Sequence, residues 1–311
     1  MLAIVCPGQG SQTPAMLQPW LEFDEAAEHL ARYTEASGAD LQTHGTTSDE
    51  ETIRDTAVAQ PLLAAGALIS AGALGLTPDK LPAYGDSVLL AGHSVGEIPA
   101  AALAGVISDT TAMELIGIRG RAMAEAAAAE PTGMAAVLGG TEDDVLTAIE
   151  NAGLSPANVN GAGQIVAAGS TEGITTLSEN PPAKARVIPL KVAGAFHTSY
   201  MAPAEGTLAQ AAQRAETAAP VVRLVSNRDG AAVSTGDEAL SRIVQQVTRP
   251  VRWDACMQSM GEAGVTGVLE LLPGGTLSGL IKRSLKGTKT FAVKSPEDLS
   301  AAAEFIEEHT A

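Results

Sequence analysis

The sequence predicts an α/β protein whose core is a mainly parallel sheet and whose middle part is a small, inserted ferredoxin-like subdomain. Short apolar runs alternate with helical patterns toward both ends of the 311 residues, and such alternation favours a parallel sheet covered by helices. The middle of the chain has the order β-α-β-β-α-β instead. Hydrophobic residues are 45% of the chain but aromatic residues only 3%, so the core must be built from Ala, Val, Leu and Ile.

The elements of the core follow from apolar runs, helical spacing and the positions of Gly and Pro. The run at 2–6 ends in Pro-Gly, which is typical of a buried strand followed by a loop, and Gly38 ends an amphipathic helix. Asp109 is the expected N-cap of a long helix. In order, the expected core elements are a strand over 2–6, a helix over 23–38, a strand over 87–94, helices over 96–108 and 109–130, a strand over 221–227, helices up to 262, a strand over 267–272, a helix from 276 and a strand over 289–293.

The stretch from residue 57 to residue 76 carries no charge, which raises the question of a membrane span. Gln60, Pro61 and Ser70, with the bias toward Ala and Gly, favour a buried core helix instead. Proline fits the first turn of a helix, so we expect this helix to begin near Pro61. We therefore expect no membrane partner.

The expected insert covers residues 130–194 and leaves 1–129 and 195–311 as two parts of an α/β core. Its order of elements is the ferredoxin-like one. The expected elements are a strand over 133–140, a helix over 141–153, two short strands within 156–169, a helix over 171–180 and a strand over 184–192.

The net charge of −17 argues against a nucleic-acid partner, which would require a basic footprint. Cys6 and Cys256 are the only cysteines, and both lie in apolar contexts, so we expect neither a disulfide framework nor a metal site. The first ten residues lack the basic segment and cleavage site of a signal peptide. These features together predict a cytoplasmic location.

Residues 92–96, Gly-His-Ser-Val-Gly, match the G-x-S-x-G pattern of a nucleophile elbow, with an apolar run before them and an Ala-rich helix after them. The two glycines permit a crowded turn that lifts the Ser94 hydroxyl clear of the sheet. The backbone N–H of Val95 then lies at a helix start, where it can stabilise an oxyanion. An ordinary turn between a strand and a helix is the alternative interpretation.

A nucleophilic serine needs a base. Three of the five histidines lie in an acidic helix, a polar loop and the tail of the chain: His29, His44 and His309. His93 adjoins Ser94, but neighbouring side chains on a turn diverge. His197 remains, just after the last strand of the insert, and its alternative interpretation is a hydrogen-bonded core histidine.

A third member of a triad would be an Asp between Ser94 and His197. The aspartates in that interval all lie at expected helix starts: Asp109, Asp143 and Asp144. We therefore expect a Ser-His dyad oriented by a group other than a carboxylate.

These motifs and the opening Cys-Pro-Gly-Gln-Gly-Ser-Gln at 6–12 resemble the malonyl-CoA:acyl-carrier-protein transacylases of fatty acid and polyketide synthesis. The similarity covers essentially the whole chain, including segments at 60–63, 119–120, 160–166, 249–253 and 273–275. It implies an α/β-hydrolase-like core with a ferredoxin-like insert, in agreement with the order of elements above. The family usually has Phe where Cys6 stands, with no expected consequence for the chemistry.

The resemblance implies a role for each position that matches a family motif. Ser94 would be the acylated nucleophile and His197 its base. The backbone N–H groups of Gln9 and Val95 would form the oxyanion hole. The backbone carbonyl of Gln246 would hold the histidine, which explains the missing acid. Two further residues would line the pocket: Gln60 and Asn160.

Arg119 would bind the free carboxylate of a malonyl group, because a guanidinium binds a planar carboxylate through two parallel hydrogen bonds. Met123 lies four residues further on and shares its helix face. A solvated surface charge is the alternative interpretation of Arg119. Phe196 stands directly before His197, where related acyltransferase domains have Phe for malonyl and Ser for methylmalonyl, so a malonyl preference is implied.

The resemblance thus implies a ping-pong acyltransferase that moves a malonyl group from malonyl-CoA to the phosphopantetheine thiol of acyl carrier protein through a malonyl-Ser94 ester. No bound cofactor is expected, since coenzyme A and phosphopantetheine are parts of the substrates. A serine esterase or thioesterase is the alternative, but it needs no carboxylate clamp such as Arg119. A third possibility is a non-catalytic subunit that binds carrier protein, which Ser94 and His197 argue against.

Docking of an acidic carrier protein on this acidic chain requires a local basic patch. The candidates are Lys184, Arg186, Lys191, Arg249, Arg252, Lys282, Arg283 and Lys286.

Overall fold

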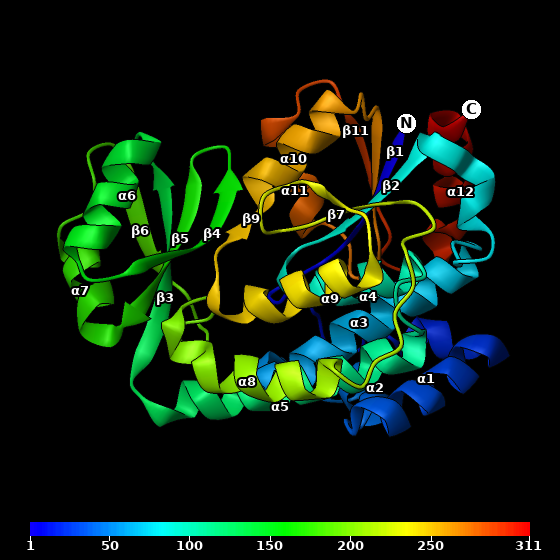
Figure 1. Ribbon diagram of the computed structural model, residues 1–311, viewed down its shortest axis with the longest axis horizontal. Coiled ribbons are helices and arrows are strands. Elements are labelled where there is room, and N and C mark those ends of the chain that lie inside the picture. Colours follow the sequence, from blue (N-terminus) through cyan, green and yellow to red (C-terminus); the bar gives the residue numbers. More distant parts are fainter.

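The computed structural model describes residues 1–311 and shows an α/β protein with two sheets side by side (Figure 1). The larger sheet has the strand order β11-β10-β1-β2-β7-β8, and the smaller sheet has the order β6-β3-β5-β4-β9. The strands are β1 Leu2–Cys6, β2 Val88–Gly92, β3 Thr132–Gly139, β4 Ser155–Gly161, β5 Gln164–Ser170, β6 Ala185–Pro189, β7 Arg223–Val225, β8 Ala232–Val233, β9 Val251–Arg252, β10 Gly267–Glu270 and β11 Lys289–Ala292.

Every pairing in the larger sheet is parallel except that of the two-residue strand β8 with β7. Strands β1 and β2 lie in the middle and are completely buried. Their register places Cys6 beside Gly92. The loop after β1 and the turn after β2 therefore leave the sheet at the same carboxyl edge, where α/β proteins usually bind their ligands.

Helices cover both faces of the larger sheet, and α3 and α5 pack against each other (Figure 1). The helices are α1 Asp24–Ser37, α2 Leu41–Thr46, α3 Thr56–Ala73, α4 Glu97–Leu103, α5 Asp109–Ala129, α6 Glu142–Asn151, α7 Thr171–Glu179, α8 Ala202–Ala212, α9 Gly236–Gln245, α10 Trp253–Glu262, α11 Thr276–Ser284 and α12 Leu299–Thr310.

Helix α3 is long and apolar enough to cross a membrane, with a mean hydropathy of 1.4, but 78% of it is buried inside the fold. It is a core helix, as its composition suggested. The prediction that it begins near Pro61 was wrong. It begins at Thr56, because the side chain of Asp55 accepts a hydrogen bond from the Ala57 N–H at 2.8 Å and caps the helix there.

The expected N-cap of α5 was also wrong by one residue. Ser108 caps this helix, and its hydroxyl accepts from the Thr111 N–H at 3.0 Å. Asp109 is already helical, and its carboxylate instead accepts hydrogen bonds from Arg32 at 2.6 Å and Tyr33 at 3.0 Å. Asp109 therefore forms its hydrogen bonds with α1, a helix distant in the sequence, and does not cap α5.

The order β-α-β-β-α-β expected for the middle of the chain is present between residues 132 and 189, as β3-α6-β4-β5-α7-β6. Its four strands pair antiparallel. The smaller sheet has a fifth strand that the sequence did not predict, because β9 pairs parallel with β4 and places Val251 beside Asn158. The later part of the chain therefore joins the two sheets. The subdomain boundaries themselves stay a prediction.

Candidate active site

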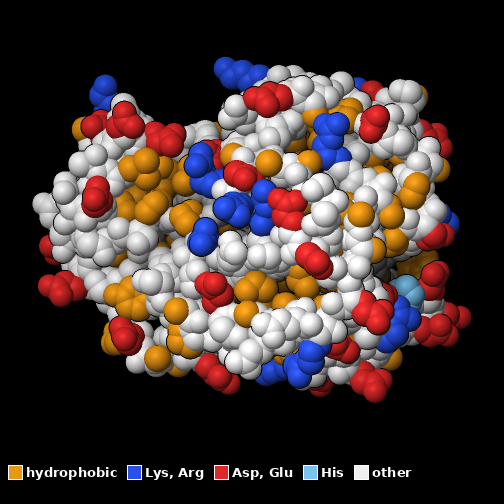
Figure 2. All heavy atoms as spheres, in the orientation of Figure 1, with side chains coloured by type: hydrophobic (Ala, Val, Ile, Leu, Met, Phe, Trp, Pro, Cys, Tyr) orange, Lys and Arg blue, Asp and Glu red, His pale blue; other side chains and the backbone are white.

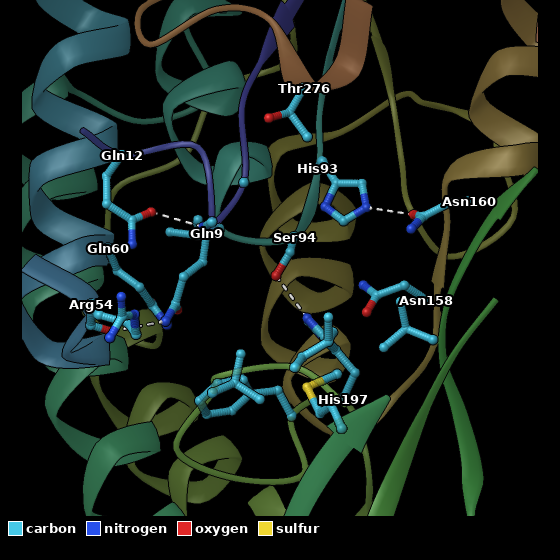
Figure 3. A pocket seen from close by; sticks show the side chains of 18 of the residues that line it. Gln9, Gln12, Arg54, Gln60, His93, Ser94, Asn158, Asn160, His197 and Thr276 are labelled. Atoms are coloured by element: carbon cyan, nitrogen blue, oxygen red, sulfur yellow. Dashed lines mark hydrogen bonds between the residues drawn. The ribbon is translucent and has the colours of Figure 1, made fainter. Parts of the chain in front are cut away.

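A cavity of about 380 Å³ lies at the carboxyl edge of β1 and β2 and also borders strands of the smaller sheet. Figure 3 shows Ser94, His197 and Gln9 around it, with Asn158 and Asn160 contributed by β4. The predicted site residues that line it are Gln9, Gln60, Ser94, Val95, Arg119, Met123, Asn160, Phe196 and His197. Gln246 is buried behind them and reaches the others through hydrogen bonds.

Ser94 stands at the tip of a tight turn between β2 and α4, and its backbone φ is 54°. The glycines on either side are sterically required. A Cβ on Gly92 would lie 2.0 Å from the carbonyl of Gly96, and a Cβ on Gly96 would lie 2.3 Å from the carbonyl oxygen of Cys6. A non-glycine residue at positive φ is strained, and such strain is concentrated at functional sites. The turn therefore has the form of a nucleophile elbow rather than of an ordinary loop.

Ser94 and His197 are in direct contact, although they are 103 residues apart. The Ser94 hydroxyl donates to His197 Nε2 at 2.7 Å (Figure 3). On the other side of the ring, His197 Nδ1–H donates to the backbone carbonyl of Gln246 at 2.8 Å. This carbonyl selects the tautomer whose Nε2 lone pair faces the serine. No Asp or Glu contacts the ring, so the orienting group is the carbonyl.

His197 has a pKa lowered to about 3, first because burial removes solvent from the ring and then because of the positive charge of Arg119. The imidazole is therefore neutral near pH 7, which is the form that can accept a proton from Ser94. His93 points elsewhere: its Nε2–H donates to Asn160 Oδ1 at 2.9 Å, and its ring packs against Trp253. Burial lowers the pKa of His93 as well.

Gln9 and Val95 both border the cavity, and the backbone N–H of neither residue donates to another protein group. Two free amide donors near a serine hydroxyl can stabilise the oxyanion of a tetrahedral intermediate. The side chain of Gln9 donates to Thr56 Oγ1 at 3.2 Å and anchors its loop to the start of α3. The geometry is therefore compatible with the oxyanion hole expected from the sequence.

Arg119 is only 1% exposed, so it is not a solvated surface charge. Its two Nη groups donate to Gln60 Oε1 at 2.7 Å and to Gln246 Oε1 at 3.0 Å, and Nη2 lies 3.5 Å from the Ser94 hydroxyl. Its Nε–H is buried and has no partner. Burial lowers the pKa of the guanidinium to about 10, so it remains charged at pH 7. Met123 borders the cavity beside Arg119, and its Sδ lies 3.5 Å from Gln60 Nε2.

Three residues of this site were not predicted from the sequence. Asn158 lines the cavity two residues before Asn160, so the alternation of a strand places both on one face. The other two are buried beneath the Ser94 turn: Glu97 is 4% exposed and Asn227 is 0% exposed. Two signals in the sequence could have found them: a carboxylate in the otherwise apolar α4, and an amide two residues after the end of β7.

Four of the eight candidate docking residues border one of two cavities, and the other four border neither. Lys191 and Arg283 border the cavity that holds Ser94. Arg249 and Arg252 border a separate cavity of about 320 Å³ together with Arg228, Arg242 and Gln246. Figure 2 shows Lys and Arg side chains gathered beside β9, between the two sheets. The others are exposed and border neither cavity: Lys184, Arg186, Lys282 and Lys286.

The family model described as "Acyl transferase domain" matches residues 3–305 of this chain. The chain belongs to this family. Among acyl transferases, it is 50% identical over 303 residues to the malonyl CoA-acyl carrier protein transacylase of Mycobacterium tuberculosis, a match that covers 97% of this chain and 99% of that protein. The corresponding Escherichia coli transacylase is 32% identical over 309 residues, with 97% and 98% covered.

Solved structures of acyl transferases have the same fold. The crystal structure of the Mycobacterium tuberculosis transacylase superposes with a TM-score of 0.93 at 50% identity, covering 97% of this chain and 99% of that one. A malonyl-transacylase in complex with the acyl-carrier protein of a type II polyketide synthase superposes with a TM-score of 0.86 at 30% identity, with 97% and 99% covered.

Proposed function

We propose that this acyl transferase moves a malonyl group from malonyl-CoA to the thiol of an acyl carrier protein in fatty acid synthesis, through an ester on Ser94. The observation that carries the proposal is the contact of Ser94 with a neutral His197 at 2.7 Å, beside a buried and charged Arg119. The relatives named above are transacylases of this specificity.

In the first half-reaction, the Ser94 oxygen attacks the thioester carbonyl carbon while His197 Nε2 takes the hydroxyl proton. The carbonyl oxygen becomes an oxyanion against the N–H groups of Gln9 and Val95. The carbon–sulfur bond then breaks, and His197 returns the proton to the sulfur of coenzyme A. In the second half-reaction, the phosphopantetheine thiol gives its proton to His197, and its sulfur attacks the ester carbonyl carbon. The bond from this carbon to the Ser94 oxygen then breaks, and His197 returns the proton to that oxygen, which regenerates Ser94.

Arg119 is the proposed contact for the free carboxylate of the malonyl group. Its Nε–H is unpartnered and its Nη2 lies 3.5 Å from the Ser94 hydroxyl, so a guanidinium edge is available beside the nucleophile. Gln60 and Gln246 fix the plane of the guanidinium. Phe196 is 6% exposed and borders the cavity next to His197, which supports a malonyl preference over branched acyl groups.

The carrier protein is proposed to dock at the mouth of the cavity, where Lys191 and Arg283 lie. These cations compensate locally for the net charge of −17. We place the activity in the cytoplasm, where two free and buried cysteines fit a reducing compartment. The chemistry needs no group beyond its two substrates, the malonyl-CoA thioester and the thiol of the carrier protein. A carrier protein of polyketide synthesis is a further proposed acceptor, because one structural neighbour is bound to such a protein.

Intact-protein mass spectrometry after mixing with malonyl-CoA tests the proposal. The wild type is expected to gain one malonyl group and to lose it again when a carrier protein with its phosphopantetheine is added. Ser94→Ala is expected to gain none. Labelling of the Ser94→Ala protein at another residue would contradict the assignment, and rapid release of free malonate without carrier protein would favour the esterase.

A further inference from the structure

Glu97 is a buried carboxylate that the mechanism above does not use. It is the first residue of α4, three positions after Ser94, and it is 4% exposed. No Lys, Arg or His forms a salt bridge with it. A buried carboxylate without a direct counter-ion is costly, so its hydrogen bonds must explain its presence.

Each oxygen of Glu97 accepts a hydrogen bond from a different loop of the site. Oε1 accepts from the backbone N–H of Asn227 at 2.5 Å, and Oε2 accepts from the side-chain Nε2–H of Gln246. Asn227 Oδ1 in turn accepts from the Ser94 N–H at 2.8 Å. The carbonyl of Gln246 accepts from His197 Nδ1–H. Glu97 therefore connects the turn of the nucleophile with the loop of the base.

The neighbours of Glu97 require it to be an acceptor at both oxygens. A backbone N–H such as that of Asn227 only donates. The side-chain amide of Gln246 could face Glu97 by either end in isolation, but its oxygen accepts from Arg119 Nη2 at 3.0 Å. A guanidinium has no acceptor, so the amide nitrogen must point toward Glu97. The ionised carboxylate accepts from both donors, one at each oxygen. Gln246 Nε2 also lies 3.1 Å from the carbonyl oxygen of Ser94 and 3.1 Å from Asn227 Oδ1, so Glu97 joins a network that already links the two loops.

We propose that Glu97 is a positioning residue for the transfer reaction: as a carboxylate it holds Ser94 and His197 in register through Asn227 and Gln246, and it loses this hold when it is protonated. The inference rests on the acyl transfer proposed above. A protonated carboxyl carries one O–H, and the oxygen that bears it is a weaker acceptor than a carboxylate oxygen. Protonation therefore weakens the bond to Asn227 or the bond to Gln246, and with it one of the two supports of the dyad.

The surroundings of Glu97 bring its protonation into the range near neutral pH. Burial raises the pKa of the carboxyl to about 7, although its hydrogen bonds and the positive charge of Arg119 favour the ionised form. The other titratable groups around this network are His197, which shares Gln246, and Cys256 on α10. The part of α9 beside Glu97 offers only apolar side chains, Ala239 and Ile243. Burial and the positive charge of Arg119 lower the pKa of His197 and keep its ring neutral over this range. We therefore expect the acylation rate to fall between pH 8 and pH 6 through protonation of Glu97.

The experiment measures the rate of Ser94 acylation by malonyl-CoA from pH 6 to pH 8, by rapid quenching and mass spectrometry. The wild-type rate is expected to fall as the pH is lowered through about 7. Glu97→Gln imitates the protonated form, and we expect its rate to be roughly 100-fold lower than that of the wild type at pH 8. Its rate is also expected to be independent of pH over this range.

Glu270→Gln is the matched control. Glu270 is equally buried, and its two oxygens accept from the N–H groups of Gly275, Leu277 and Ser278, but no hydrogen bond links it to Ser94 or His197. Leu277 borders the same cavity as Ser94, so the control is compared by the shape of its pH profile and not by its absolute rate. The same substitution at Glu270 is expected to lower thermal stability and to leave the pH dependence of the acylation rate as in the wild type. This control also removes any contribution from titration of the substrate.

A Glu97→Gln protein that acylates as fast as the wild type, or that keeps the decline below pH 7, would overturn the inference. If that variant does not fold, infrared spectroscopy of the wild type decides. The C=O band of a buried protonated carboxyl must then grow as the pH is lowered, with the same midpoint as the fall in the acylation rate. The absence of this band would overturn the inference. A wild type that forms no malonyl ester would instead contradict the proposed function.

Discussion

Arg119 allows the sharpest test of what the site recognises. Its guanidinium is 1% exposed and held by two amide oxygens, from Gln60 and Gln246. Arg119→Met keeps most of the apolar stem and removes every donor. A malonyl carboxylate would then be buried without its cation, whereas an acetyl group has no charge to lose.

The expected loss in the malonyl specificity constant follows from the cost of leaving one partner of a buried, hydrogen-bonded charge pair unpaired. This cost is about 2–5 kcal/mol. At about 1.4 kcal/mol per factor of ten, this is a loss of ~30-fold to several thousand-fold. Loss of the two bonds to Gln60 and Gln246 disturbs the site for every acyl group. The ratio of the malonyl to the acetyl specificity constant cancels that shared loss and isolates the carboxylate.

The assay compares transfer of malonyl and acetyl groups from coenzyme A to carrier protein. We expect the ratio to fall by that factor in Arg119→Met and to fall substantially in Arg119→Lys, because an ammonium cannot form two parallel hydrogen bonds. Arg121→Met is the control, since Arg121 lies on the same helix but donates to the Ser37 carbonyl at 2.7 Å and does not border the cavity. Equal losses for both acyl groups in Arg119→Met would refute the reasoning and give Arg119 a purely structural role.

Two further predictions concern the neighbours of Ser94. His197→Ala is expected to slow acylation and transfer to the carrier protein by ~10²–10⁴-fold each, because one base serves both steps; single-turnover measurements of the two steps check this, and a loss confined to one step would indicate a different base. Phe196→Ser is expected to raise the methylmalonyl to malonyl ratio of specificity constants by about 10- to 200-fold, the value of a methyl-sized change in a pocket. An unchanged ratio would remove Phe196 from the selectivity argument.

Much of the site was predictable because it is encoded locally. The Gly-His-Ser-Val-Gly turn needs small residues at fixed spacing, and the structure shows the two glycine positions closed to any Cβ. The β-α-β-β-α-β order is likewise a property of consecutive segments. The start of α3 was predicted too late, because Pro61 is compatible with a first helical turn, whereas the side chain of Asp55 caps the helix six residues earlier.

Contacts between distant segments were decided only by the tertiary structure. The sequence could select His197 by elimination, but its distance to Ser94 and the tautomer set by the Gln246 carbonyl depend on how three loops meet. Glu97 receives its hydrogen bonds from residues 130 and 149 positions away. Periodicity predicts which face of a helix is buried, but not which polar group meets it there. Hydrogen-bond networks in a core need both partners placed within about 3 Å, and only the packing of the whole chain fixes positions that closely.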